Sequence, residues 1–131
     1  MVTLHSGIDL VDITRLEGLK PEIRIRFIKR VFTPGEQEEA DQNPNRLMGK
    51  FAVKEAVAKA LGCGIGLIGW QSIEVLSREN GAPFIILHDK AKAYEHEAGI
   101  TSWSISITHE GKYAAAVAIA LGEDPSLGIP G

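Results

Sequence analysis

The chain has 131 residues, of which 44% are hydrophobic and 24% are charged, and its formal net charge is -3. These values are typical of one globular domain, and the 17 acidic residues outnumber the 14 basic ones, which leaves no general positive field for nucleic acid. The single cysteine, Cys63, excludes an intrachain disulfide and a cysteine-based zinc site and is typical of a reducing cytoplasm. Because no secretory signal pattern opens the chain and no apolar run approaches about 18 residues, we expect neither secretion nor a membrane span.

The first third of the sequence predicts a strand followed by helices. Residues 2–13 are rich in Val, Ile and Leu and alternate loosely, which is typical of a strand, with Gly7 as a possible bulge. A helix with one apolar and one basic stripe is predicted over 21–32. The TPGE stretch at 33–36 has the residues of a capping box, so a short helix to about Asp41 follows.

A long helix is predicted over residues 46–61, with Asn45 as its N-cap residue and the glycines of GCGIG at its end. Its core, FAVKEAVAKALG, is apolar apart from Lys54, Glu55 and Lys59, which indicates burial. A buried carboxylate costs several kcal/mol unless a cation or hydrogen bonds compensate it. The simpler alternative is an exposed Glu55–Lys59 pair, worth roughly 0.3 to 0.5 kcal/mol.

The second half of the sequence predicts two hairpins. Residues 70–77 and the FIILH stretch flank a turn at Asn80 and Gly81, and residues 102–109 and 112–121 flank a turn at Glu110-Gly111. A helix that begins at an aspartate lies between the hairpins.

The predicted fold class is therefore α+β, with one antiparallel sheet packed on a long central helix. We expect a single domain over residues 1–122 and a loose, Gly/Pro-rich tail over 123–131.

Three polar residues stand where the pattern predicts apolar or interior surroundings. Asp9 lies within an apolar strand and Glu55 within the apolar helix, while His109 ends a strand. Each has a simpler explanation: a sheet-edge carboxylate, a helix ion pair and a turn histidine. Together, two carboxylates from separate elements can hold Mg²⁺, which usually takes one or two protein carboxylates and completes its shell with water and substrate phosphate. Lys59, one turn beyond Glu55, would meet the phosphate charge, so the residues predict a metal-assisted phosphate site.

Four motifs follow one another along the chain: GIDLVDITRL, FAVKEAVAKALGCGIG, NGAPFI and SISITHEGKYAAAVAIA. In this order and spacing they resemble the holo-acyl-carrier-protein synthases, the small single-module 4'-phosphopantetheinyl transferases. The resemblance covers about residues 7–120 and implies the 4'-phosphopantetheinyl transferase fold in homotrimers, with coenzyme A sites between protomers. It also implies Mg²⁺-dependent transfer of phosphopantetheine from coenzyme A to a serine of apo acyl carrier protein, with release of 3',5'-ADP. The resemblance places this reaction in the cytoplasm, where the modified carrier serves fatty acid biosynthesis.

The same resemblance assigns roles to individual residues. Asp9 and Glu55 match the Mg²⁺ ligands, and Lys59 joins them as a catalytic residue near the phosphates. The implied coenzyme A contacts are Lys54, Lys59, Asn80, Gly81, Pro83 and His109, with Arg46 and Lys50 as candidates for its 3'-phosphate. The acidic carrier protein would contact Arg15, Arg24 and Arg26.

Several points stay open at the level of sequence. Either Glu55 or a metal-bound water would accept the serine proton, and we favour the water because a metal-bound carboxylate is a weakened base. Glu110 stands where the family usually has a threonine, so a hydroxyl contact to the nucleotide could be lost. Two alternatives remain: a coenzyme A-binding module without transferase activity, and a trimeric interaction protein without a site.

Overall fold

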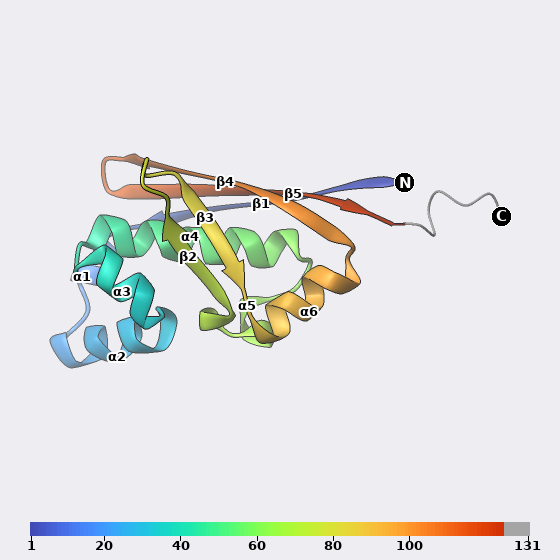
Figure 1. The fold of residues 1–131 in the computed structure, drawn as a ribbon. Helices are drawn as coiled ribbons and strands as arrows, with labels where there is room; N and C mark the ends of the chain where they lie inside the picture. The colour runs from blue at the N-terminus through green and yellow to red at the C-terminus, as the bar shows by residue number, and fades with distance from the viewer. Residues whose placement is uncertain (125–131) are drawn as a thin grey trace.

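The computed structural model describes residues 1–124, so most of the predicted tail lies outside the described residues (Figure 1). In chain order the elements are β1 (Val2–Asp12), α1 (Thr14–Glu17), α2 (Pro21–Val31), α3 (Pro34–Ala40), α4 (Pro44–Ala60), α5 (Ile65–Ile68), the short 3-10 helix η1 (Trp70–Ser72), β2 (Ile73–Ser77), β3 (Pro83–Leu87), α6 (Asp89–Glu97), β4 (Ile100–Glu110) and β5 (Tyr113–Glu123). Strand β5 thus extends past residue 122, where we expected the domain to end. No helix in this part of the chain is long and apolar enough to cross a membrane.

The strands form two sheets, so the prediction of one antiparallel sheet is wrong. Strands β1, β5 and β4 make an antiparallel sheet in the order β1-β5-β4, and β2 pairs with β3 alone. In Figure 1 the three-stranded sheet lies along one side of α4, while α2, α5 and α6 lie along the other.

Side chains explain why β2 accepts no second strand. Lys54 donates to the Ile73 carbonyl and Lys50 to the Val75 carbonyl, on the edge of β2 that faces away from β3. On the same edge, the Val75 N–H donates to a glutamate of α3. The Ser77 N–H does so as well. Because helix side chains satisfy this edge, it offers no free row of donors and acceptors to another strand.

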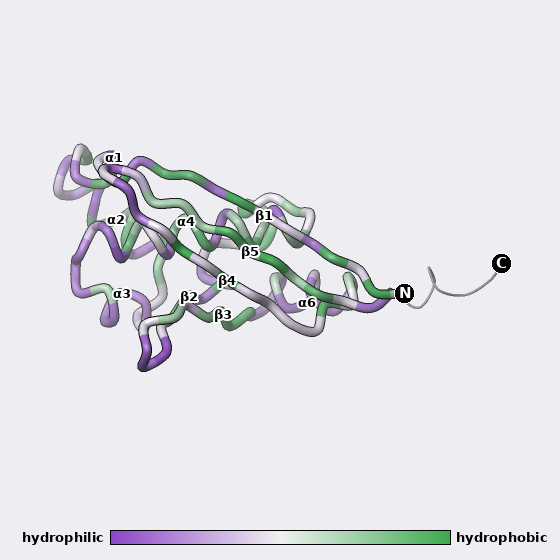
Figure 2. Tube along the Cα trace, turned by 90° about the horizontal axis from the view of Figure 1, so that it is seen from above, coloured by the Kyte–Doolittle hydropathy of each residue, from purple (hydrophilic) through white to green (hydrophobic). Residues whose placement is uncertain are grey.

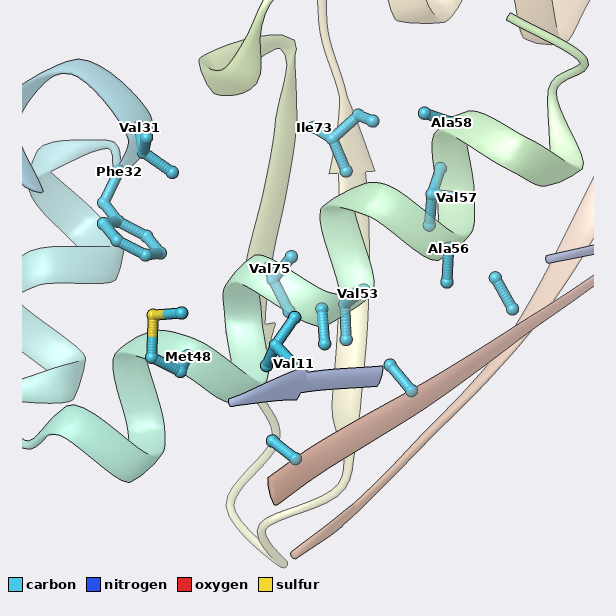
Figure 3. Packing of buried hydrophobic residues seen from close by; sticks show 14 of the residues in the cluster. Val11, Val31, Phe32, Met48, Val53, Ala56, Val57, Ala58, Ile73 and Val75 are labelled. Atoms are coloured by element: carbon cyan, nitrogen blue, oxygen red, sulfur yellow. The ribbon is translucent and has the colours of Figure 1, made fainter. Parts of the chain in front are cut away.

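Small residues let α4 lie close to the three-stranded sheet. Alternate residues of β5, from Ala114 to Ala120, are buried, as expected for a strand with one covered face. A Cβ atom at Gly7 of β1 would lie 1.8 Å from the Ala56 carbonyl oxygen of α4. Figure 3 shows the apolar side chains between the helix and the strands, among them Val11, Val53 and Val57.

Gly7 therefore serves a close approach of helix to strand. The predicted bulge is wrong, since β1 pairs with β5 from Val2 to Asp12 without a shift in register.

The helix ends agree with the sequence in one case and differ in others. The capping box at α3 is confirmed: the Thr33 hydroxyl accepts from the Glu36 N–H, and the Glu36 carboxylate accepts from the Thr33 N–H. Helix α4 begins earlier than expected, because the Asn43 side chain accepts from the Arg46 N–H and proline follows Asn43 at the first helical position. The N-cap of α6 is His88, one residue before the predicted aspartate.

Candidate active site

The close approach at Gly7 places Asp9 of β1 beside the second half of α4. Lys59 Nζ donates to the Ile8 carbonyl oxygen at 2.8 Å and to Asp9 Oδ1 at 3.3 Å. The Asp9 side chain is 18% exposed and that of Lys59 is 53% exposed. Lys59 therefore donates to β1. The structure does not show the exposed Glu55–Lys59 ion pair within α4 that was the simpler alternative.

Glu55 completes an acidic pair with Asp9. Burial raises the pKa of the Glu55 carboxyl, the nearby Asp9 carboxylate raises it further, and Lys59 opposes both effects. The two carboxylates are thus close enough to repel each other, and both residues are partly exposed. We call Asp9, Glu55 and Lys59 the acidic site.

The donor set of the acidic site fits Mg²⁺. Both candidate ligands are carboxylates, whose oxygens are hard ligands. The two carboxylates repel each other, and a bound cation would reduce this repulsion. Among the described residues, no group of three or more His, Cys, Asp or Glu side chains could hold a metal ion. A two-carboxylate set without further protein ligands is the kind of site that Mg²⁺ shares with water and phosphate.

A cavity of about 450 Å³ lies near the start of α4 and gathers other predicted residues. Arg46, Gly81, Pro83 and His109 line it, from α4, the β2–β3 turn, β3 and β4. His109 Nε2 lies 3.0 Å from the Asn45 carbonyl oxygen. We call this the nucleotide cavity, because its predicted residues are those that the resemblance assigns to coenzyme A.

The nucleotide cavity is also lined by residues that the sequence did not predict. Gly49 makes room in it, since a Cβ atom there would lie 3.3 Å from His109 Nε2. Glu39, Val75, Ser77 and Ile107 also line the cavity, and only their positions in the folded chain identify them.

Two other predicted coenzyme A contacts are occupied within the protein. Lys50 lines the cavity, but it forms an ion pair with Glu39 and donates to the Val75 carbonyl. Asn80 accepts from the Ala82 N–H at 3.0 Å and thereby shapes the β2–β3 turn.

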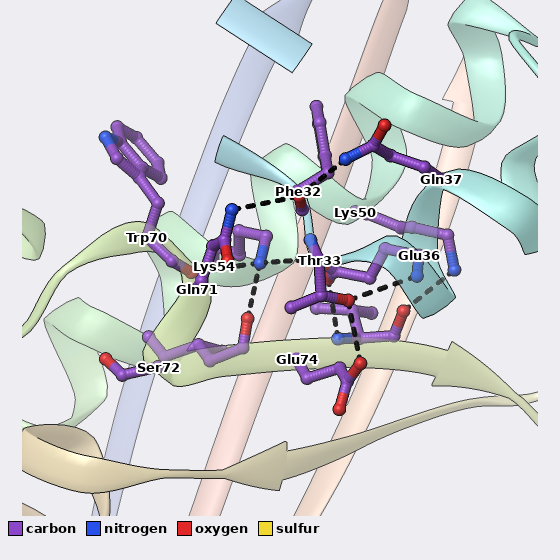
Figure 4. A network of polar contacts seen from close by, with 12 residues as sticks. Phe32, Thr33, Glu36, Gln37, Lys50, Lys54, Trp70, Gln71, Ser72 and Glu74 are labelled. Atoms are coloured by element: carbon purple, nitrogen blue, oxygen red, sulfur yellow. Dashed lines mark hydrogen bonds and ion pairs between the residues drawn. The ribbon is translucent and has the colours of Figure 1, made fainter. Parts of the chain in front are cut away.

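Lys54 is a clear correction to the predicted coenzyme A contacts. Its side chain is fully buried, and Nζ donates to Glu36 Oε1 at 2.9 Å, to the Trp70 carbonyl at 3.0 Å and to the Ile73 carbonyl (Figure 4). A lysine ammonium has three donors, so none remains for a phosphate. The local pattern could not show this, because the capping box already accounted for Glu36.

The acidic site and the nucleotide cavity lie on opposite edges of the three-stranded sheet. Asp9 on β1 pairs with Ala116 on the central strand β5, which pairs with Ile107 on β4 in the cavity wall. Two strand spacings separate Asp9 from Ile107, about 10 Å. The two sites therefore lie on different strands of the same sheet.

The basic residues predicted to contact the carrier border two further hollows. Arg15 lines an apolar cavity of about 240 Å³, together with Leu16, Leu19 and Phe27. Arg24 lines a separate groove, and Arg26 is exposed on the same helix, α2. The sequence missed the apolar cavity, although the spacing of its Leu and Phe residues was the available signal.

Comparison with known proteins identifies the family. The family model of the 4'-phosphopantetheinyl transferase superfamily matches residues 6–118. This chain belongs to that superfamily. The matched range of this transferase includes the acidic site and His109, and the predicted family and fold class are confirmed.

Relatives of this superfamily member are similar over nearly their whole length. The holo-[acyl-carrier-protein] synthase of Moorella thermoacetica is 42% identical over 120 residues, which cover 88% of this chain and 92% of the relative. The synthase of Caldanaerobacter subterraneus is 40% identical over 126 residues, 94% of this chain and 98% of the relative. The solved structure of the Helicobacter pylori holo-[acyl-carrier-protein] synthase in complex with coenzyme A has a TM-score of 0.79 and 33% identity, covering 88% of this chain and 98% of that one.

Proposed function

We propose that this protein is a holo-[acyl-carrier-protein] synthase, which transfers 4'-phosphopantetheine from coenzyme A to a serine of apo acyl carrier protein and releases 3',5'-ADP. The observation that carries this proposal is the acidic site, in a chain of the 4'-phosphopantetheinyl transferase superfamily whose relatives are named for this reaction.

Asp9 and Glu55 are the proposed Mg²⁺ ligands. When bound, Mg²⁺ would supply positive charge that stabilises the diphosphate as the serine oxygen bonds to the phosphorus on the pantetheine side and the bond from that phosphorus to the bridging oxygen breaks, which leaves the other phosphate on 3',5'-ADP. Asp9 and Glu55 would hold the metal ion beside the second half of α4. Lys59, half exposed beside them, lies where it could contact a substrate phosphate.

The nucleotide half of coenzyme A is proposed to bind in the nucleotide cavity. Arg46 supplies a cation there, and Gly81 and Pro83 form a small-residue wall. Lys50 adds little positive charge because Glu39 neutralises it, so Arg46 is the better candidate for the 3'-phosphate.

A homotrimer is proposed because the family resemblance implies sites between protomers and because each chain exposes an apolar sheet face. On the outer face of β1, Leu4, Ile8 and Leu10 are 65 to 75% exposed, and Leu121 of β5 is 44% exposed opposite Leu4. Figure 2 shows hydrophobic residues recurring along β1 and β5. Contiguous exposed apolar surface of this kind marks an interaction site.

The trimer is tested with a Leu4→Lys variant in light scattering after gel filtration. We expect the mass to fall towards that of one chain and transfer to be lost, because a charge is costly in a buried apolar interface. The matched control is Ala93→Lys on the exposed side of α6, which should stay assembled. An unchanged mass for Leu4→Lys contradicts the assignment of this face.

The carrier protein is proposed to contact Arg15, Arg24 and Arg26, with the apolar cavity beside Arg15 as a hydrophobic anchor point. Binding between an acidic carrier and these basic residues should weaken as salt rises, since exposed charges are screened. We place the reaction in the cytoplasm, in fatty acid biosynthesis, consistent with a chain whose single cysteine is free.

Intact-mass spectrometry of apo acyl carrier protein, incubated with this protein, coenzyme A and Mg²⁺, tests the function. We expect the carrier to gain the mass of one phosphopantetheine arm, and the gain to vanish with EDTA or in the Asp9→Ala variant. The control Asp89→Asn changes an exposed aspartate of α6 and should transfer normally. Coenzyme A binding without mass gain would instead favour the binding-module alternative, with Glu110→Thr as the first change to restore transfer.

A further inference from the structure

The two contacts of Lys59 carry an inference that rests on the proposed function and extends it. We propose that Lys59 is a built-in counter-ion, which holds the Asp9 carboxylate while no divalent cation is bound and leaves it when the cation binds. The charge of Lys59, no longer paired with Asp9, is then available to a substrate phosphate.

The position of the ammonium supports this exchange. Lys59 Nζ contacts Asp9 Oδ1 at 3.3 Å, so it pairs with a carboxylate that is a proposed metal ligand. Its shorter bond, 2.8 Å, is to the Ile8 carbonyl oxygen on the same strand. The lysine can therefore leave the carboxylate and keep an acceptor nearby.

The charges of the acidic site supply the driving force. Asp9 and Glu55 repel each other, and Lys59 is the cation that lowers this repulsion. A divalent cation on both carboxylates neutralises them and repels the ammonium, so lysine and metal compete for Asp9.

Because Lys59 is half exposed, breaking its bond to Asp9 costs little free energy. Half of the Lys59 side chain is exposed, and one of its three donors has no protein partner among the contacts of the described residues. Water can replace the bond to Asp9 without leaving a buried group unsatisfied.

The first test measures Mn²⁺ binding by electron paramagnetic resonance in the absence of coenzyme A, on the full protein. We expect Lys59→Met to bind Mn²⁺ at least about threefold more tightly than the parent, because the competing ammonium is gone. The matched control is Lys112→Met, which removes a lysine paired with Asp12 at 3.8 Å on the same sheet and should leave the affinity unchanged.

The outcomes separate this inference from the proposed function. If neither the parent nor any variant binds Mn²⁺, the proposed metal site is wrong and the inference falls with it. If the parent binds Mn²⁺, Asp9→Ala does not, and Lys59→Met binds no more tightly than the parent, only the counter-ion role is overturned.

A second test distinguishes displacement from a general change in charge. The rate at which an acetylating reagent modifies Lys59 is measured by peptide mass mapping with and without Mn²⁺, with Lys112 as the internal reference. Release from Asp9 should make the Lys59 amine more accessible to the reagent, so it should be modified faster when Mn²⁺ is added. An unchanged or lower rate overturns the proposal even if Lys59→Met binds Mn²⁺ more tightly.

Discussion

Two of the lysine–carboxylate pairs of helix α4, those of Lys54 and Lys59, differ in almost every physical respect. The pair of Lys54 with Glu36 spans 2.9 Å, and both side chains are fully buried. The pair of Lys59 with Asp9 spans 3.3 Å, and its lysine is half exposed.

Hydrogen bonding explains why the two pairs have different uses. Every donor of Lys54 has an acceptor within the protein, and Glu36 also accepts from the N–H groups of Thr33 and Val75 (Figure 4). Burial lowers the pKa of Lys54, and the Glu36 carboxylate opposes that shift. This closed network joins α3, α4 and β2, whereas the pair at Lys59 leaves carboxylate oxygens open to a metal ion.

The Lys54 pair should therefore contribute to folding stability and the Lys59 pair to activity. The largest expected effect is the loss of stability when Lys54 is replaced. Lys54→Met should lower the free energy of unfolding by about 3 to 5 kcal/mol, because it leaves the Glu36 carboxylate buried without its cation. Urea unfolding measures this loss, and adding Glu36→Gln to the same chain should recover part of it. Transfer per folded molecule should persist; if transfer fails while the unfolding free energy stays at the parent value, Lys54 contacts substrate after all.

The reverse pattern is expected at Glu55. Glu55→Gln should slow phosphopantetheine transfer by about a hundredfold or more, since a proposed metal ligand is lost. Its folding should be as stable as the parent or more so in EDTA. The pKa of Glu55 is raised in the folded state, so ionising it at neutral pH favours the unfolded chain, and glutamine removes that penalty.

Thermal unfolding with and without Mg²⁺ and coenzyme A measures both parts of the Glu55 prediction. The parent should gain stability from the ligands by mass action, and the Glu55→Gln variant should gain much less. Equal transfer rates for the two proteins would rule out Glu55 as a ligand.

A smaller effect is expected at the edge of the closed network. The Thr33 hydroxyl accepts from the Glu36 N–H at 3.1 Å and donates to Glu74 Oε2 at 2.7 Å. Thr33→Ala should therefore cost about 1 kcal/mol of unfolding free energy, as for other helix N-caps, without slowing transfer. Thr33→Ser keeps the hydroxyl and serves as the control, and a loss equal to that of the alanine variant would assign the effect to the methyl group.

The sequence by itself determined what depends on neighbours along the chain. The capping box at residues 33–36, the two hairpins and the long apolar helix follow from local pattern, and four ordered motifs identify the family. The residues of the acidic site were also predicted, because Asp9 and Glu55 are unusual in their own segments.

The tertiary structure alone decided how distant residues are paired. Lys59 meets Asp9 across 50 positions, and the Val75 N–H reaches Glu36 across 39, so no local pattern could assign Lys54 to the fold rather than to coenzyme A. The reason for Gly7 is likewise a helix that arrives about 50 residues later in the chain. Periodicity reports which face of an element is apolar, but the partner of a buried charge depends on which elements meet, and that is a property of the packed chain.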